Sequence, residues 1–334
     1  MTAPLIRASL SRIAQLQDFA IEPLARSDWA NGDYVIGEVI GLPGQGIGIE
    51  LTNGRMAQVD LGDRLLGAFG VRFATLEATG TWEAIGPDGR MTALTAAGLF
   101  GRLTSKSPLI PTLTELVYRG HVLVAGRKAA MQDSALPNTG CRFELPVLLI
   151  VGSSMSAGKT RSAQIIIRRL KKLGLRVLAA KLTGAGRYRD LLAMGDAGAD
   201  VLFDFVDAGL PSTVCAETDY RRAAEALLSQ MATVTADVAV IEAGASPLEP
   251  YNGETAVALL EPHLRMTVLC TSDPYAVVGI MQAFGRTPDW VAGIACNTDA
   301  GQALIHKLSG LPSLRLLDPA VLPTLDEMLK ERFC

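Results

Sequence analysis

A glycine-rich segment near the middle of the chain combines residue types that bind phosphate. Residues 152–160 read Gly-Ser-Ser-Met-Ser-Ala-Gly-Lys-Thr, after the apolar run Pro146–Val151 and before the helical pattern Thr160–Lys172. A strand, a glycine-rich turn ending in Gly-Lys-Thr and a helix form the context of a phosphate-binding loop. Backbone N–H groups of such a loop converge on phosphate oxygens, and the helix start adds its positive dipole end. The segment therefore predicts a nucleoside triphosphate site.

Within this loop, Lys159 is the predicted cation for the β- and γ-phosphates, and the Thr160 hydroxyl is a predicted Mg²⁺ ligand. As a loop lysine, Lys159 is expected to be exposed. The alternative is a glycine-rich turn with a surface lysine, because the spacing G-x5-G-K-T is one residue longer than the common G-x4-G-K-[ST]. The predicted nucleotide contacts are Gly152, Ser153, Ser156, Ala157, Gly158, Lys159, Thr160 and Arg161.

Three further polar residues, Lys181, Glu242 and Asn297, each follow or end a predicted strand. Ligands of open α/β sheets bind outside the carboxyl ends of the strands, so we expect these side chains to converge on the loop. Mg²⁺ prefers oxygen ligands, which makes Glu242 the first carboxylate predicted to bind the metal beside Thr160. The alternative for Glu242 is a strand-end carboxylate that accepts hydrogen bonds from loop amides.

Other charged residues near these strand ends have two interpretations each. Asp200 is the additional predicted metal ligand, with Asp204 as a second candidate, although acidic residues at a helix start are also common solvated caps. Arg187 and Arg189 could clamp a carboxylate or phosphate, or could lie in an exposed loop. Lys106 is the first lysine of the chain, and it could bind an anionic substrate or be a solvated loop residue.

The second half of the chain alternates apolar runs of strand length with helical patterns. The predicted strands are Pro146–Val151, Leu175–Lys181, Val238–Glu242, Met266–Thr271 and Val291–Cys296. The predicted helices are Thr160–Lys172, Tyr220–Met231, Thr255–Leu264 and Gly301–Leu308. Buried runs alternating with helices are typical of a parallel sheet covered on both faces. We expect residues 141–334 to form a doubly wound, mainly parallel α/β domain of the P-loop NTPase class.

The first part of the chain, residues 1–140, has a different texture. From Asp33 to Leu94 it consists of short β-rich runs separated by turns, which predict a small barrel or sandwich of about five or six strands. That stretch contains no His, Cys or Lys, so an interaction or capping role is indicated. Leu5–Gln17 has apolar residues at helical spacing and predicts an amphipathic helix. Gly98–Gly126 predicts a loop, a helix and a strand.

The loop spacing G-x5-G-K-T resembles that of dethiobiotin synthetase and its relatives. In that family a Glu-Gly-Ala-Gly segment ends a strand and places a carboxylate on the metal, and the segment beginning at Glu242 is similar to it. The resemblance implies that Asn297 reads the nucleotide base and that Lys181 lies near the phosphates. It further implies ATP and Mg²⁺ as cofactors, with Lys159, Lys181 and Glu242 as catalytic residues.

The stretch from Pro146 to the C-terminus is also similar to a family of two-domain P-loop proteins that includes D-glutamate N-acetyltransferases. The matching pieces are the loop itself, Thr183-Gly184, Asp204-Phe205 and the segment Glu242–Pro247. This resemblance implies a Rossmann-like first domain, from which the β-rich segment departs. It also implies acyl transfer, with the loop holding the phosphates of a coenzyme A thioester.

Composition restricts the partners and the function classes. The 334 residues carry 31 Lys and Arg against 34 Asp and Glu, and a net charge of −3 provides no basic field for nucleic acid. The five cysteines are scattered without a Cys-x-x-Cys pair, and no apolar run approaches the ~18 residues of a membrane span. We expect a cytoplasmic homo-oligomer whose partners are a nucleotide and an anionic small-molecule substrate, with no nucleic acid and no membrane.

These observations together predict a Mg·ATP-dependent small-molecule enzyme that performs phosphoryl transfer or ligase-type activation of a carboxylate or amine. The alternatives are a regulatory or maturation NTPase acting on a protein partner, and an acyltransferase that uses a coenzyme A thioester. The loop Gly152–Lys159 has no second lysine near its start, which argues against partner-activating dimeric ATPases that carry one.

Overall fold

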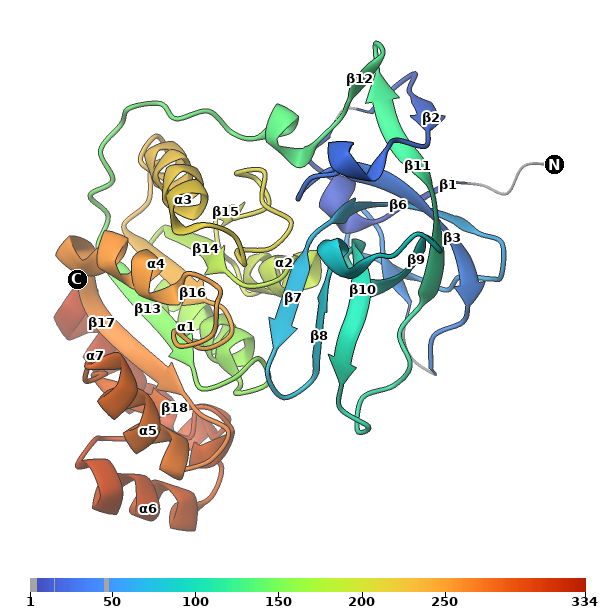
Figure 1. Cartoon of the computed structure of the whole chain (residues 1–334). Helices are drawn as coiled ribbons and strands as arrows, with labels where there is room; N and C mark the ends of the chain where they lie inside the picture. The colour runs from blue at the N-terminus through green and yellow to red at the C-terminus, as the bar shows by residue number, and fades with distance from the viewer. Residues whose placement is uncertain (1–4, 15, 45–47) are drawn as a thin grey trace. The chain divides into compact units, whose positions relative to one another are not determined.

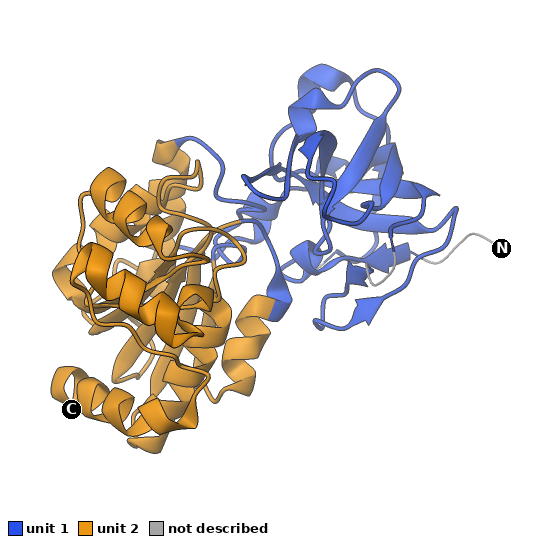
Figure 2. Cartoon of the chain, turned by 90° about the horizontal axis from the view of Figure 1, so that it is seen from below, with its two compact units in different colours: residues 1–137, 185–189, 205–216 blue, residues 138–184, 190–204, 217–334 orange. Residues whose placement is uncertain are grey.

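The computed structural model describes residues 5–14, 16–44 and 48–334. Its contacts divide the chain into two compact units (Figure 2). Unit 1 comprises residues 1–137, 185–189 and 205–216, and unit 2 comprises residues 138–184, 190–204 and 217–334. Because unit 1 takes in two short segments from the second half of the chain, the domain division at residue 140 stays a prediction.

Unit 2 contains a parallel sheet of six strands in the order β15-β14-β16-β13-β17-β18 (Figure 1). The strands are β13 (Val147–Gly152), β14 (Val177–Thr183), β15 (Val201–Asp204), β16 (Val238–Ala243), β17 (Leu264–Cys270) and β18 (Trp290–Ala292). All neighbouring pairs run parallel. The strand that leads into the glycine-rich loop, β13, therefore lies inside the sheet, between β16 and β17.

Helices cover both faces of this sheet (Figure 1). They are α1 (Lys159–Lys172), α2 (Tyr188–Asp196), α3 (Glu217–Met231), α4 (Gly253–Leu260), α5 (Tyr275–Phe284), α6 (Asp299–Ser309) and α7 (Leu322–Phe333). Along β13, Leu148 and Ile150 join the core cluster formed with α1, whereas Leu149 and Val151 face a cavity lined by α4 and α5. This alternation confirms the predicted doubly wound α/β fold. None of the described helices combines the length and apolar composition that a bilayer crossing requires.

Unit 1 is built on a sheet whose path runs β1-β6-β3-β11-β9-β10-β8-β7. Since β6 pairs with both β3 and β10, the strands β6, β3, β11, β9 and β10 close into a ring, the small barrel that the short runs predict. The strands of this sheet are β1 (Leu5–Arg7), β2 (Ala20–Glu22), β3 (Tyr34–Gly41), β6 (Arg64–Phe69), β7 (Val71–Ala74), β8 (Ala78–Thr81), β9 (Arg90–Thr95), β10 (Leu99–Lys106), β11 (Glu115–Val124) and β12 (Arg127–Lys128). The strands β4 (Ile49–Glu50) and β5 (Met56–Ala57) pair with each other in a separate two-stranded sheet.

Two predictions for this unit are wrong. The helix predicted over Leu5–Gln17 is instead the strand β1 followed by a short 3-10 turn, Ser9–Ser11. Pairing of β1 with β6 supplies backbone hydrogen bonds that override the helical spacing of the apolar residues. The helix predicted within Gly98–Gly126 is also absent from that stretch, where β10 and β11 both join the barrel. Residue 15 lies outside the described residues.

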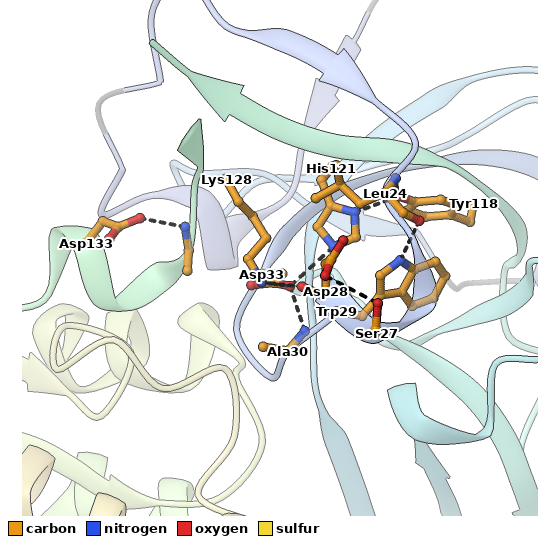
Figure 3. Close-up of polar contacts among 11 residues, drawn as sticks. Leu24, Ser27, Asp28, Trp29, Ala30, Asp33, Tyr118, His121, Lys128 and Asp133 are labelled. Carbon is orange, nitrogen blue, oxygen red and sulfur yellow. Dashed lines mark hydrogen bonds and ion pairs between the residues drawn. The ribbon is translucent and has the colours of Figure 1, made fainter. Parts of the chain in front are cut away.

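A buried polar network links the turn before β3 to β11 and β12 (Figure 3). His121 Nε2 lies 3.2 Å from Asp33 Oδ2, and His121 Nδ1 lies 2.5 Å from the Tyr118 hydroxyl. Lys128 Nζ donates to Asp33 Oδ2 over 2.9 Å, and the Trp29 ring packs on Tyr118 with centroids 4.5 Å apart. Because His121 and Asp33 are fully buried and hydrogen-bonded, the network accounts for this histidine as a part of the barrel core.

Candidate nucleotide-binding site

The loop between β13 and α1 folds around its own lysine. Lys159 Nζ donates to the Ser154 carbonyl over 2.6 Å, and the side chain is only 3% exposed. A Cβ at Gly152 would lie 2.8 Å from Lys159 Nζ, so the absence of a side chain there makes room for the ammonium group. Gly158 has a φ of +97°, a conformation that costs any other residue steric strain. The expectation of an exposed lysine is therefore wrong, because the side chain turns back over Gly152.

The structure brings the two predicted metal ligands together. Thr160 Oγ1, in the first turn of α1, donates to Glu242 Oε2 over 3.0 Å. Glu242 lies on β16, where it pairs in register with Ile150 of β13, and it is 2% exposed. A hydroxyl and a carboxylate are hard oxygen donors that suit Mg²⁺, which keeps several waters and takes its other ligands from phosphates. The donor set at this position fits Mg²⁺.

A second buried lysine lies beside Glu242. Lys181 of β14 is in register with Glu242 on one neighbouring strand and with Asp204 on the other. Its Nζ donates to Asp190 Oδ2, in the first turn of α2, over 2.7 Å. Burial by itself lowers the pKa of Lys181, but Asp190 and Glu242 outweigh that effect and raise the pKa above its usual value. The neighbouring carboxylates therefore favour the charged form of Lys181.

Lys159 has a different electrostatic balance. Burial lowers the pKa of its ammonium group, and Glu242 offsets this only in part. Glu249, in the turn after β16, also favours the charged form. A phosphate anion would complement both buried ammonium groups, Lys159 and Lys181, at this edge of the sheet. The arrangement is suited to binding a polyanion together with a divalent cation.

Two segments from other strand ends contact the loop. After β18, the chain enters a 3-10 turn, Ile294–Cys296, instead of the longer strand that the sequence predicts. Ile294 N donates to the Ala157 carbonyl over 3.4 Å, so the segment that ends at Asn297 touches the loop. After β17, Ser272 N donates to Ser153 Oγ over 3.2 Å. Asn297 is exposed, and its role toward a nucleotide base stays a prediction.

Asp200 is not brought to this site, and its predicted role as a metal ligand is corrected. Its carboxylate accepts hydrogen bonds from Lys171 Nζ and, over 2.7 Å, from Val177 N, at the first residue of β14. The strand β15 begins directly after Asp200, so this residue lies at the amino ends of the strands, opposite the loop. Asp204 ends β15 and lies beside Lys181, which makes it the nearer of the two aspartates.

The remaining predicted residues are spread around the loop or lie elsewhere. Ser156 is exposed at the loop tip, and Ala157 is buried under it. Arg161 is exposed on α1 and donates to Gln164 Oε1 over 3.3 Å. In unit 1, Lys106 Nζ donates to the carbonyls of Ser107 and Ile110 and so closes its own turn.

Tyr188 and Arg189, at the start of α2, belong to unit 1, and their backbone N–H groups donate to the fully buried Glu50 carboxylate of the same unit over 2.7 Å and 3.0 Å. Asp190, the next residue, was not singled out by the sequence. Its only local signal is an acidic residue in a helix first turn, and its importance comes from contact with Lys181. The sequence analysis also does not identify Glu249, because the turn that holds it carries no recognisable motif.

No family model and no curated protein matches this chain. Among solved structures, the signal recognition particle receptor FtsY from Elizabethkingia anophelis is 13% identical over 52% of this chain and 58% of that chain, with a TM-score of 0.35. HypB from Helicobacter pylori, solved in complex with nickel, is 18% identical over 56% of this chain and 86% of that chain, with a TM-score of 0.37. A DUF1611 family protein from Anabaena variabilis is 15% identical over 62% of this chain and 65% of that chain, with a TM-score of 0.37.

The chain thus spans less than two thirds of the length of FtsY. At these identities and scores the matches assign neither a family nor a function. The P-loop fold is identified by the chain's own parallel strand order and by the strand, loop and helix that hold Lys159. The resemblances to dethiobiotin synthetase and to the D-glutamate N-acetyltransferase family are not confirmed by these matches and stay predictions.

Proposed function

We propose that unit 2 binds Mg·ATP at residues 152–160 and transfers the γ-phosphoryl group to an anionic small molecule, such as a carboxylate. The observation that carries this proposal is the pair of Thr160 Oγ1 and Glu242 Oε2, 3.0 Å apart, flanked by the buried ammonium groups of Lys159 and Lys181. Such a grouping combines metal ligands with phosphate-binding cations, which are the two requirements of phosphoryl transfer.

The chain's own residues have separable tasks in this reaction. Lys159 and the N–H groups at the start of α1 bind the phosphates, and Thr160 with Glu242 holds the metal. Mg²⁺, when bound, neutralises charge that develops on the phosphoryl oxygens. Lys181, oriented by Asp190, supplies a second positive charge for the phosphoryl group or for the acceptor anion. Positioning and charge are sufficient for this chemistry, because little covalent help from protein is needed.

A regulatory NTPase is the second candidate, and one observation favours it. The segments 185–189 and 205–216, which leave β14 and β15 next to Lys181 and Asp204, both belong to unit 1. Lys181 and Asp204, which would lie near a bound phosphate, are thus followed closely in the chain by residues of unit 1. In that case, a protein partner that binds unit 1 would respond to the nucleotide bound in unit 2. A cytoplasmic location and a homo-oligomeric state stay predictions of the sequence.

The test begins with ligand-induced stabilisation by Mg·ATP, Mg·GTP and acetyl-coenzyme A, each with wild type and with Lys159→Ala. A ligand at about 100 times its Kd stabilises the folded protein by about 2.7 kcal/mol. We expect Mg²⁺-dependent stabilisation by ATP that is lost in the variant. Stabilisation by acetyl-coenzyme A alone would replace this proposal with acyl transfer.

The second step measures ADP formation with a panel of carboxylates and amines as acceptors. The proposal predicts that one class of acceptor increases ADP formation well above the rate without acceptor. ADP formation that no acceptor changes, together with tight Mg·ATP binding, would support the regulatory NTPase instead.

A further inference from the structure

A cavity of about 180 Å³ lies in unit 2, on the face of the sheet covered by α4 and α5. Its floor is apolar and buried, with Leu149 and Val151 from β13 and Leu269 from β17. Val257 of α4 and Ile280 of α5 form the opposing wall. Because neighbouring residues on β13 pack against α1 on the other face, this cavity is separate from the core cluster beneath the loop.

The lining becomes polar only toward solvent. Arg286 and Glu261 are 37% and 53% exposed, and they form an ion pair with each other. Arg286 also lies over the Phe284 ring, with its Cζ 5.6 Å from the ring centroid. Thr267 and Thr287 also line the cavity. A ligand entering here would therefore meet one cation, its partner carboxylate and two threonines above an aliphatic floor.

The size and lining of the cavity restrict the ligand. An engineered cavity of about 150 Å³ lined by Leu, Ile and Phe binds benzene, so a phenyl-sized body is the scale that fits here. Ligand pockets typically combine an apolar lining with a few polar groups that orient the ligand. The exposed ion pair of Arg286 with Glu261 contributes little to stability, so a ligand carboxylate can replace Glu261 on the guanidinium group.

We propose that this cavity binds a small amphipathic monocarboxylate, whose phenyl-sized or branched aliphatic body contacts Leu149 and Val151 and whose carboxylate pairs with Arg286. Planar guanidinium and carboxylate groups form paired, charge-assisted hydrogen bonds, which give the ligand one orientation. Val151 directly precedes Gly152, so the bound acid contacts the strand that carries the phosphate-binding loop. The proposal does not depend on the function proposed for that loop.

The experiment titrates phenylacetate, 2-phenylethanol and acetate into the full chain by isothermal calorimetry. Phenylacetate has both the apolar body and the carboxylate, whereas each of the other probes lacks one of them. The variant Arg286→Gln removes the charge at the mouth. Arg221→Gln is the matched control, because Arg221 is 45% exposed and pairs with Glu217 one turn away on α3, a helix that does not line the cavity. Leu264→Phe, at the half-buried start of β17, adds volume to the lining.

We expect phenylacetate to bind the wild type saturably with a Kd of about 1 mM or lower. Arg286→Gln should weaken binding by about tenfold or more, since a charge-assisted pair is lost. Leu264→Phe should weaken it as well, while Arg221→Gln should leave it unchanged. 2-Phenylethanol should bind at least about tenfold more weakly than phenylacetate, and acetate should not bind.

Three results would overturn the proposal. The first is no saturable binding of phenylacetate to the wild type up to about 10 mM. The second is equal affinity of phenylacetate for wild type and Arg286→Gln, with both proteins folded by circular dichroism. The third is equal affinity of 2-phenylethanol and phenylacetate, which would mark the cavity as an apolar void without a carboxylate site.

Discussion

The hydrogen bond between Thr160 and Glu242 joins the two groups on which the magnesium site depends, and a double-mutant cycle can measure its strength. Thr160→Val removes the hydroxyl and keeps the side-chain shape, and Glu242→Gln removes the charge and keeps a hydrogen-bond acceptor. The bond is 3.0 Å long and Glu242 is 2% exposed, so solvent screens it little. Hydrogen bonds to charged groups contribute about 1.5–3 kcal/mol, against about 1 kcal/mol for neutral ones. The difference predicts a coupling free energy of about 1 kcal/mol.

The assay is urea unfolding of the wild type, both single variants and the double variant, without nucleotide or Mg²⁺. Trp290 lies in β18 and is fully buried, so its fluorescence reports on unit 2. The other two tryptophans, Trp29 and Trp82, lie in unit 1 and are replaced by Phe in all four proteins. A coupling free energy within about 0.3 kcal/mol of zero, the error of additivity for independent sites, would refute the hydrogen bond.

Three further variants test other parts of the structure. Asp190→Asn removes the charge that pairs with the buried Lys181 ammonium and should lower the free energy of unfolding by about 2 kcal/mol in the same urea assay, because a hydrogen bond between charged groups is weakened. An unchanged value would mean that the two side chains are not paired. Gly158→Ala places a Cβ at a φ of +97° and should cost about 1–2 kcal/mol, together with loss of the nucleotide-induced thermal shift. The Arg169 hydrogen bond holds the pKa of Asp326 below its usual value, so its stabilisation is complete above pH ~3.9 and is lost as pH falls through the lower native pKa. Asp326→Asn should therefore reduce the loss of thermal stability below pH ~4, and an unaltered acid profile would argue against that pair.

The sequence predicts the loop well because its signal is local. The strand β13, the glycine-rich turn and the helix α1 follow one another without interruption, so each supports the interpretation of the next. Lys181 and Glu242 could also be placed, since each ends an apolar run and parallel strands bring such ends to one edge. The geometry of the site, including the buried position of Lys159, could not be predicted from these patterns.

The features that the sequence does not predict correctly are short elements and elements that depend on contacts with distant parts of the chain. The strand β15 has four residues, three of them only partly buried, so it lacks the apolar run that marks a strand, and the sequence does not show that Asp200 precedes this strand while Asp204 ends it. Asp190 acquires its role from contact between a helix start and a strand end, which residue spacing does not reveal. The strand β1 depends on β6, a partner more than fifty residues away in the chain, so its local periodicity was misleading.

The most direct test of the proposed nucleotide site is calorimetric titration of Mg·ATP into wild type, Lys159→Ala and Lys172→Ala. Lys172 is an exposed lysine at the opposite end of α1, so its replacement controls for a general loss of positive charge. We predict saturable, Mg²⁺-dependent binding to the wild type and to Lys172→Ala, and no detectable binding to Lys159→Ala with its fold confirmed by circular dichroism. Equal affinity of Mg·ATP for the wild type and for Lys159→Ala would contradict the assignment of residues 152–160 as a phosphate-binding loop.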